Sequence, residues 1–485
     1  MKRFAFLVLL AMMVTATAST PPKYKSITWE KLNSTGPNLQ QIGTLAVRHS
    51  RDIASSPWSI GCETLDRDYG DFSQYKDYVG ELGVKHARLQ SGWAKTEKQK
   101  GVYDFAWLDT IVDGLIEQGV EPWVCLCYGN PLYKSQVDLG AGIFTAEETM
   151  TGWRNYVEAT VAHYKDKVTV WEIWNEPSHS ADPAAYANLM IQASKAIRKV
   201  QPKATIMGFT VHGSFSGGEF KFPRAVFEVL KAKGELECID RVSYHPYTQN
   251  PDSFYLKFDE FRNLLNTYNP RLALYQGESG CPSILEWGHA LNNHPWTEYS
   301  QAKWNLRRMA GDWARSIPTS IFTMVDLNYG FMLQSFGQLR ADLNHKIIYK
   351  RPSFHGIQHM TAFFDDAVRP TGLLAYESDA KRKMEVAGFS KANTPVVMAW
   401  YNDQTPDDTL TWDPITLTIK GVVFKDPVYV EMITGRVFSL GKDAWKTADG
   451  NTVFTGLPMW DSPVMLAERT QVPLREDAKQ EMGKK

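Results

Sequence analysis

The sequence predicts a (β/α)8 barrel followed by a C-terminal β-sandwich, and three observations lead to this fold class. The chain has 485 residues, of which 43% are hydrophobic, so it exceeds one average domain and has enough apolar surface for a large core. Short apolar runs alternate eight times with segments of helical periodicity between residues 58 and 364. Beyond about residue 369 the pattern becomes strand-like alternation without helices. We therefore expect a barrel over residues 53–366 and a sandwich over residues 367–472.

The first eighteen residues have the features of a secretory signal peptide. Lys2 and Arg3 precede an apolar run over residues 4–14, and residues 16–18 (Ala-Thr-Ala) supply the small side chains of a cleavage site. This run is shorter than the ~20 residues that a membrane-spanning helix needs. We therefore expect a secreted or periplasmic protein without an integral membrane segment. The lysine-rich end, residues 473–485, is expected to form a flexible tail.

Composition excludes some classes of partner and weakly favours another. The formal net charge is -1 and the charges are interspersed, so nothing indicates binding to nucleic acid or to an anionic membrane. Aromatic faces stack on sugar rings, and the chain has 16 Trp and 21 Tyr, although most aromatics in a barrel are core residues. Five cysteines show no zinc spacing, so buried thiols are expected, with a single disulfide left open.

The eight strand and helix units follow one another regularly along the first part of the chain. Each apolar run is short and has no polar face, which fits a parallel sheet that is buried on both sides. The predicted strands cover residues 58–62, 84–89, 120–127, 168–174, 204–210, 239–244, 272–276 and 320–325. The predicted helices cover residues 72–83, 104–119, 147–165, 183–200, 223–233, 253–268, 297–315 and 352–364. A doubly wound open sheet is disfavoured because no glycine-rich phosphate loop follows an early strand.

The second part of the chain reads as antiparallel strands joined by turns. Val, Ile, Tyr and Phe alternate with polar residues over short stretches that Gly, Asp and Asn separate. The predicted strands cover residues 383–389, 395–401, 415–419, 428–437 and 463–467, with a Thr434-Gly435 turn inside the fourth. This pattern predicts the sandwich.

A glutamate whose side chain has restricted conformational freedom lies at the end of one predicted barrel strand. Residues 171–177 read WEIWNEP, so Glu176 lies between Asn175 and Pro177 at the end of the fourth strand. A side chain held there suits a carboxyl group that must meet a substrate atom at a fixed distance. On its own the tripeptide also fits a simple turn after a strand.

A second strand end carries another carboxyl group. Residues 271–280 read RLALYQGESG, an apolar run that brings Glu278 into a glycine-flanked turn. Both carboxyl groups then lie at the C-terminal ends of barrel strands, where barrel active sites occur. Cleavage of a glycosidic bond needs two such groups, one to protonate the leaving oxygen and one to attack or to activate water.

These two motifs resemble those of the clan A glycoside hydrolases, which are retaining enzymes on an eight-fold barrel. The resemblance implies that Glu176 is the acid/base and Glu278 the nucleophile. Relatives such as the family 39 β-xylosidases often carry a β-sandwich after the barrel and draw the N-terminal segment into it. We therefore expect residues 19–52 to pair with the sandwich.

The resemblance also implies four substrate-binding residues. Arg88, in the stretch HARLQSGW, matches the arginine that helps to keep the nucleophile ionised, and Asn175 matches the asparagine that bonds the sugar 2-hydroxyl. His245 and Tyr247, in the stretch SYHPY, match residues that contact the substrate and the nucleophile oxygen. A solvated or helix-paired Arg88 and a structural His245 are the alternatives for those two positions.

The chain departs from the clan at the end of the eighth strand, where the clan often has a Trp beneath the sugar. Residues 324–330 read MVDLNYG instead. The substitutes that the sequence offers are Asp326, Asn328, Tyr329, Trp93, Trp287 and Trp296.

Together these features predict a secreted retaining β-glycosidase that acts on an oligosaccharide or polysaccharide. No cofactor is expected, and no metal, because no His or Asp cluster has ligand spacing at the strand ends. Long loops over residues 128–146, 279–296 and 326–351 favour a pocket and exo action. An endo-β-glycanase of the same clan and a sugar-binding protein without turnover remain the alternatives. The sugar, the linkage and the oligomeric state stay open.

Overall fold

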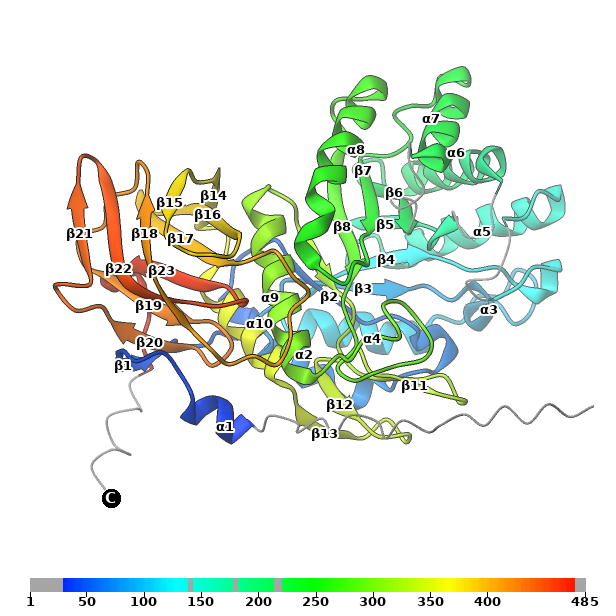
Figure 1. Ribbon diagram of the computed structural model, residues 1–485. Coiled ribbons are helices and arrows are strands. Elements are labelled where there is room, and N and C mark those ends of the chain that lie inside the picture. Colours follow the sequence, from blue (N-terminus) through cyan, green and yellow to red (C-terminus); the bar gives the residue numbers. More distant parts are fainter. Residues whose placement is uncertain (1–28, 138–142, 178–181, 213–219, 476–485) are drawn as a thin grey trace, which may run out of the picture.

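The computed structural model describes residues 29–137, 143–177, 182–212 and 220–475. Eight parallel strands close into a barrel, and helices surround it (Figure 1). The barrel strands are β2 (Trp58–Gly61), β3 (His86–Gln90), β4 (Glu121–Leu126), β5 (Val170–Ile173), β6 (Thr205–His212), β7 (Arg241–His245), β8 (Ala273–Ser279) and β9 (Thr319–Ile321). The predicted (β/α)8 barrel is thereby confirmed. The predicted signal peptide, residues 1–18, lies outside the described residues.

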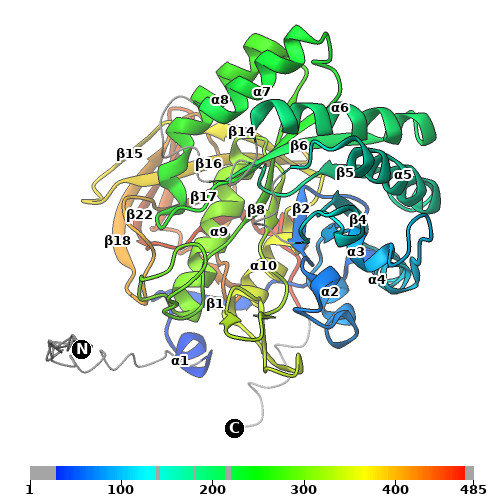
Figure 2. The ribbon, with the colours of Figure 1, turned by 90° about the vertical axis from the view of Figure 1, so that its right-hand side faces the viewer.

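The helices lie on the outside of the strands, as Figure 2 shows for α4 to α8. Their bounds are α2 (Lys76–Glu81), α4 (Ala106–Glu117), α5 (Glu147–Tyr164), α6 (Pro183–Val200), α7 (Lys221–Ala232), α8 (Tyr255–Tyr268), α9 (Glu298–Ala314) and α10 (Pro352–Phe363). Two short helices, α1 (Trp29–Ser34) and α3 (Trp93–Thr96), complete this part of the chain. Among the helices of the described ranges, none combines the length and the apolar character that crossing a bilayer requires.

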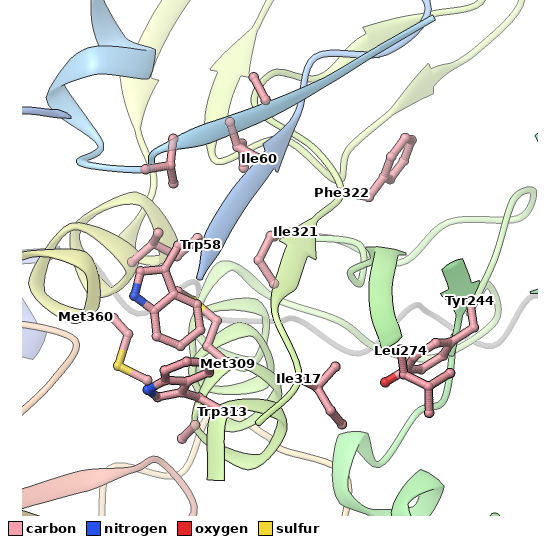
Figure 3. Packing of buried hydrophobic residues seen from close by; sticks show 14 of the residues in the cluster. Trp58, Ile60, Tyr244, Leu274, Met309, Trp313, Ile317, Ile321, Phe322 and Met360 are labelled. Carbon is pink, nitrogen blue, oxygen red and sulfur yellow. The ribbon is translucent and has the colours of Figure 1, made fainter. Parts of the chain in front are cut away.

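The barrel closes where its first strand pairs with its last. Ile60 of β2 lies opposite Ile321 of β9, and both side chains are buried. Behind this seam, Trp58 packs edge-on against Trp313 of α9 with ring centroids 6.0 Å apart, beside Met360 of α10 (Figure 3). Burial of large apolar side chains on both faces of β2 is what holds the seam together.

Two antiparallel sheets form the C-terminal domain, which confirms the predicted sandwich. The larger sheet has the order β1 (Gln40–Thr44), β20 (Arg436–Ser439), β19 (Pro427–Glu431), β23 (Val464–Glu468), β17 (Thr394–Tyr401), β16 (Met384–Lys391) and β14 (Val368–Leu373). The smaller has the order β15 (Tyr376–Ser378), β18 (Asp413–Ile419), β22 (Asn451–Met459) and β21 (Trp445–Ala448). Strand β1, from the N-terminal segment, pairs with β20 at the edge of the larger sheet.

The predicted tail is wrong for its first residues. Leu474 forms a bridge with Leu45, and the Arg475 N–H donates to the Thr44 carbonyl at 2.8 Å. The chain therefore returns to the end of β1 before residue 476, because an edge strand leaves backbone groups free for such pairing. Residues 476–485 lie outside the described part.

Several strands were missed because Pro and Gly interrupt their alternation. Pro370 and Gly372 sit in β14, where the register shifts, and Gly456 and Pro458 sit in β22. The long segment after β9 contains two short hairpins, β10 (Leu327–Asn328) with β11 (Leu333–Gln334), and β12 (Leu339–Ala341) with β13 (Ile347–Lys350). The segment over residues 326–351, which was predicted as a loop, thus contains regular secondary structure.

Helix α9 joins the barrel to the sandwich, and Figure 1 shows it between the two domains with α10. Its side chains are almost all buried, including charged ones that cross to the sandwich. The Lys303 Nζ lies 2.6 Å from Asp461 Oδ1 and donates to the Thr409 carbonyl at 2.6 Å. The Arg307 Nη1 donates to the Gln404 carbonyl at 3.0 Å. One buried ion pair and two hydrogen bonds from charged side chains therefore join the two domains.

Replacement of Lys303 tests this junction. Because the Lys303 side chain is 0% exposed and that of Asp461 is 8% exposed, Lys303→Met leaves a buried carboxylate without its cation. We expect the free energy of unfolding to fall by about 3–5 kcal/mol, measured by urea and thermal unfolding. The matched control is Lys199→Met, which removes an exposed pair with Glu158 (2.7 Å) and should cost less than about 1 kcal/mol. Equal losses in the two variants would contradict this account.

Candidate active site

A buried arginine lies at the centre of the C-terminal mouth of the barrel. The Arg88 side chain, from β3, is 0% exposed. Its guanidinium contacts Glu172 Oε2 at 2.7 Å, Glu278 Oε2 at 2.6 Å and Glu63 Oε1 at 3.2 Å, and it donates to Asn175 Oδ1 at 2.8 Å. Guanidinium donors lie in a fixed plane, so four acceptors from β2, β5, β8 and the segments that follow them are held in one arrangement. Arg88 is thus neither solvated nor paired with a helix.

Glu278 accepts a hydrogen bond on each carboxylate oxygen. Arg88 contacts Oε2, and the Tyr247 hydroxyl donates to Oε1 at 2.8 Å. The prediction placed Glu278 in a turn, but β8 continues to Ser279 and carries it within the strand, beside a register shift against β9. Irregularities of this kind re-aim side chains near active sites. Gly277 is required there, because an added Cβ would collide with the Ser243 hydroxyl.

Glu176 is held by an unusual backbone and by a histidine. Its φ is 47° and that of Trp174 is 68°, both in the left-handed region that non-glycine residues rarely adopt. Such strain is of order 1–3 kcal/mol per residue and clusters at functional sites. The His245 Nδ1 lies 2.7 Å from Glu176 Oε1, and 3.8 Å from Glu278 Oε2. His245 therefore bridges the two carboxyl groups.

The charges of Glu176 and Glu278 raise the pKa values of two neighbouring side chains, those of His245 and Tyr247. Burial alone would lower the pKa of His245, but the charges of Glu278 and Glu176 outweigh it and raise the pKa above its ordinary value. For Tyr247, burial raises the pKa, and the nearby Glu278 and Glu176 raise it further. Tyr247 thus stays a phenol at neutral pH and donates its proton to Glu278.

The two predicted catalytic carboxyl groups lie close together. Oxygens of Glu176 and Glu278 and a ring nitrogen of His245 all lie within 4.8 Å of one another. Carboxyl groups about 5–5.5 Å apart fit direct attack on a sugar, whereas a separation of about 6.5–9.5 Å leaves room for a water. The arrangement can therefore place one carboxyl group against an anomeric carbon and the other against the leaving oxygen.

The expectation that strand ends would offer no metal-ligand cluster needs correction. Within the described ranges, Glu176, His245 and Glu278 form one group with spacing suited to a metal ion. Sequence spacing could not reveal it, because barrel closure brings three distant strand ends together. Arg88 and His245, whose pKa is raised, already place positive charge against these carboxylates, which reduces the attraction for a metal cation. Metal-independent action stays a prediction.

Three residues of this network were not predicted. Glu63 lies just beyond Cys62 after the end of β2, Glu172 lies inside β5, and the Tyr128 hydroxyl accepts from Asn175 Nδ2 at 2.8 Å. A charged residue inside an apolar strand, as in WEIW, was the available signal for Glu172, since such residues are rarely buried without a partner. Burial raises the pKa of Glu63 to about 7, Arg88 opposes this shift, and Glu278 adds to it.

Most substitutes for the strand-eight Trp have other roles. Asp326 pairs with the Arg351 guanidinium at 2.7 and 2.9 Å, and Trp93 and Trp296 are buried. Asn328 donates to the Leu343 carbonyl at 2.8 Å. The remaining two differ in position: Tyr329 is half-buried and near the carboxylates, whereas Trp287 is 76% exposed at the rim.

Comparison with known proteins agrees with this geometry. Residues 71–257 match the glycosyl hydrolases family 39. A family 39 glycoside hydrolase from the gut symbiont Bacteroides cellulosilyticus WH2 superposes with a TM-score of 0.61 at 18% identity, covering 85% of this chain and 81% of that one. Over residues 71–257 the chain resembles the family 39 glycosyl hydrolases, and it shares their fold. A monomeric β-xylosidase from Caulobacter crescentus CB15 has the same fold, with a TM-score of 0.56 at 17% identity over 89% of this chain and 98% of that one.

A relative that was found by sequence comparison matches a smaller share of this chain than the two structures do. The aryl-phospho-β-D-glucosidase of Bacillus subtilis (strain 168) is 23% identical over 203 residues, which is 39% of this chain and 41% of that protein. The similarity of this family 39-like chain to that relative thus spans about two fifths of the relative's length.

Titration of Glu63 offers a test of the charge network. Its pKa is about 7 in the folded protein against an ordinary 4.5, so the folded state binds the proton more tightly. The resulting stabilisation is complete below pH 4.5 and is lost as the pH rises through 7. It amounts to something on the order of 3 kcal/mol. Glu63→Gln should remove this dependence, so the wild-type minus variant difference in unfolding free energy should decline between pH 4.5 and 7. A difference independent of pH would contradict the network.

Proposed function

We propose that the protein is a retaining β-glycosidase in which Glu278 is the nucleophile and Glu176 the acid/base. The observation that carries this proposal is the close approach of the two carboxyl groups, within 4.8 Å, at the ends of β5 and β8. Their surroundings differ in the way that the two roles require. A guanidinium and a phenol, from Arg88 and Tyr247, both donate to Glu278, whereas Glu176 shares a hydrogen bond with His245.

The first step breaks the glycosidic bond. One oxygen of Glu278 attacks the anomeric carbon, while Glu176 gives its proton to the leaving oxygen, so the leaving sugar departs as an alcohol. A glycosyl ester now joins the sugar to Glu278. A carboxylate has about four lone-pair sites, so both donors can stay in place during the attack.

The second step releases the sugar. Glu176, now ionised, removes a proton from water, and the hydroxyl oxygen attacks the anomeric carbon and expels Glu278. Two inversions give net retention. The raised pKa of His245 favours a proton on this imidazole, within hydrogen-bond distance of Glu176. The strained backbone at Glu176 keeps its carboxyl group in place through both steps.

We further propose that the enzyme acts at chain ends, on β-linked sugars of plant or microbial glycans, after export. The long segments that follow β4, β8 and β9 at the mouth support a closed pocket, and the Caulobacter neighbour named above is a β-xylosidase. Export rests on the signal-like residues 1–18.

A panel of nitrophenyl α- and β-glycosides tests the activity, with the anomer of the released sugar followed by NMR. We expect hydrolysis of a β-glycoside with retained configuration. Release of the inverted anomer would reject the mechanism. If no glycoside of the panel is hydrolysed but a polysaccharide is cleaved, the enzyme acts within chains and not at their ends. If neither is hydrolysed, the result favours a sugar-binding protein.

Two alanine variants separate the roles. Glu278→Ala should lose turnover, because no ester can form. Glu176→Ala should lose about 10²–10⁴-fold in rate, and azide should restore turnover by giving a β-glycosyl azide, since azide needs no general base. An α-glycosyl azide from Glu176→Ala would mean that the roles are exchanged.

A further inference from the structure

Two large aromatic side chains are exposed on loops at the barrel mouth. Trp287, in the loop after β8, is 76% exposed, and Phe331, in the turn between β10 and β11, is 83% exposed. Both loops follow the C-terminal ends of strands, as do Glu176 and Glu278. Soluble proteins leave aromatic side chains in water at a cost, so paired exposed aromatics beside a site indicate a ligand surface.

The two loops touch each other. A side chain at Gly288 would lie 3.1 Å from the Met332 methyl group, so the residues that follow Trp287 and Phe331 are in contact. The His289 and Tyr329 rings lie 5.0 Å apart by centroid. Trp287 and Phe331 thus belong to one surface, which we call the rim platform.

The rim platform continues inward to the catalytic carboxylates. The Phe331 and Tyr329 ring centroids are 6.4 Å apart, and Tyr329 packs on Tyr69 at 4.4 Å. Burial raises the pKa of Tyr329, Arg67 opposes this, and the charges of Glu278 and Glu63 raise it again. Tyr329 is therefore within electrostatic reach of Glu278.

The loops that carry the platform are held by internal bonds. The Ser283 N–H donates to the Ser335 carbonyl at 2.9 Å, and the Ser335 N–H donates to the buried Glu286 carboxylate. The Asn293 N–H donates to the Glu286 carbonyl at 2.8 Å, and Asn292 Nδ2 donates to the Trp287 carbonyl at 3.1 Å. A surface fixed before binding loses little entropy when a ligand docks.

We propose that Trp287 and Phe331 form a subsite that binds the leaving-group sugars of a β-linked oligosaccharide. Aromatic faces complement the apolar faces of sugar rings, and continuity with the catalytic pair places this surface where the chain beyond the scissile bond must run. The inference rests on the proposed glycosidase function and adds to it a preference for oligosaccharide over single-ring leaving groups.

The test compares substrates of different length. The probes are nitrophenyl β-xyloside and β-glucoside, and β-1,4-linked xylo- and cello-oligosaccharides of two to six sugars. Wild-type kcat/KM should rise with length. Trp287→Ala and Phe331→Ala should each lower kcat/KM about tenfold on the longer oligosaccharides, chiefly through KM, and leave the nitrophenyl substrates unchanged. Leu256→Ala, at an 83% exposed position on α8, is the matched control and should change neither class.

The outcomes separate this inference from the proposed function. No wild-type hydrolysis of any probe would reject the function itself. If kcat/KM does not depend on substrate length, or if the variants match wild type on every oligosaccharide, the proposed subsite at the rim platform is rejected. The proposed glycosidase function is not affected by that result. Unchanged nitrophenyl hydrolysis in the variants also shows that they fold.

Discussion

The buried guanidinium of Arg88 is the interaction on which the rest of the site depends. It lies 2.6–3.2 Å from three carboxylates that belong to three separate parts of the barrel: Glu63 after β2, Glu172 in β5 and Glu278 in β8. Burial of so much charge carries a large desolvation penalty, and only a complete set of partners offsets it. The network therefore holds the strand ends in register, and the same contacts set the position of Glu278.

The separate roles that we propose for Glu176 and Glu278 rest on what surrounds each carboxyl group. Glu278 receives a full positive charge and a phenol proton, whereas Glu176 faces an imidazole that itself gains or loses a proton. This asymmetry arises from backbone features as much as from side chains. The register shift at Gly277 turns Glu278 toward Arg88, and the left-handed residues around Asn175 turn Glu176 toward His245. The scaffold behind them is rigid, since α9 is joined to the sandwich through the buried Lys303–Asp461 ion pair.

Much of this arrangement could be predicted from the sequence, because a parallel barrel strand delivers its last residues to one known face. Glu176 and Glu278 were predicted from their places at strand ends, and Arg88, Asn175, His245 and Tyr247 from the resemblance to clan A. The structure brings all six together. Glu63, Glu172 and Tyr128 were missed, because only the closed barrel shows which side chains reach its axis. The strands β14 and β22 were missed because Pro and Gly, which usually mark turns, lie within them. No local pattern reveals that Tyr329 lies within electrostatic reach of Glu278, because this placement depends on how the β10–β11 hairpin folds.

The central claim is that Arg88 and Tyr247 prepare Glu278 to bond covalently with the sugar. The most direct measurement traps that bond with a 2-deoxy-2-fluoro-β-glycosyl fluoride of the sugar that the enzyme accepts, followed by mass spectrometry of the intact protein and its peptides. The account predicts a mass gain of one fluoroglycosyl group per chain, located on Glu278. A label on Glu176, or hydrolysis without any labelled protein, would contradict it.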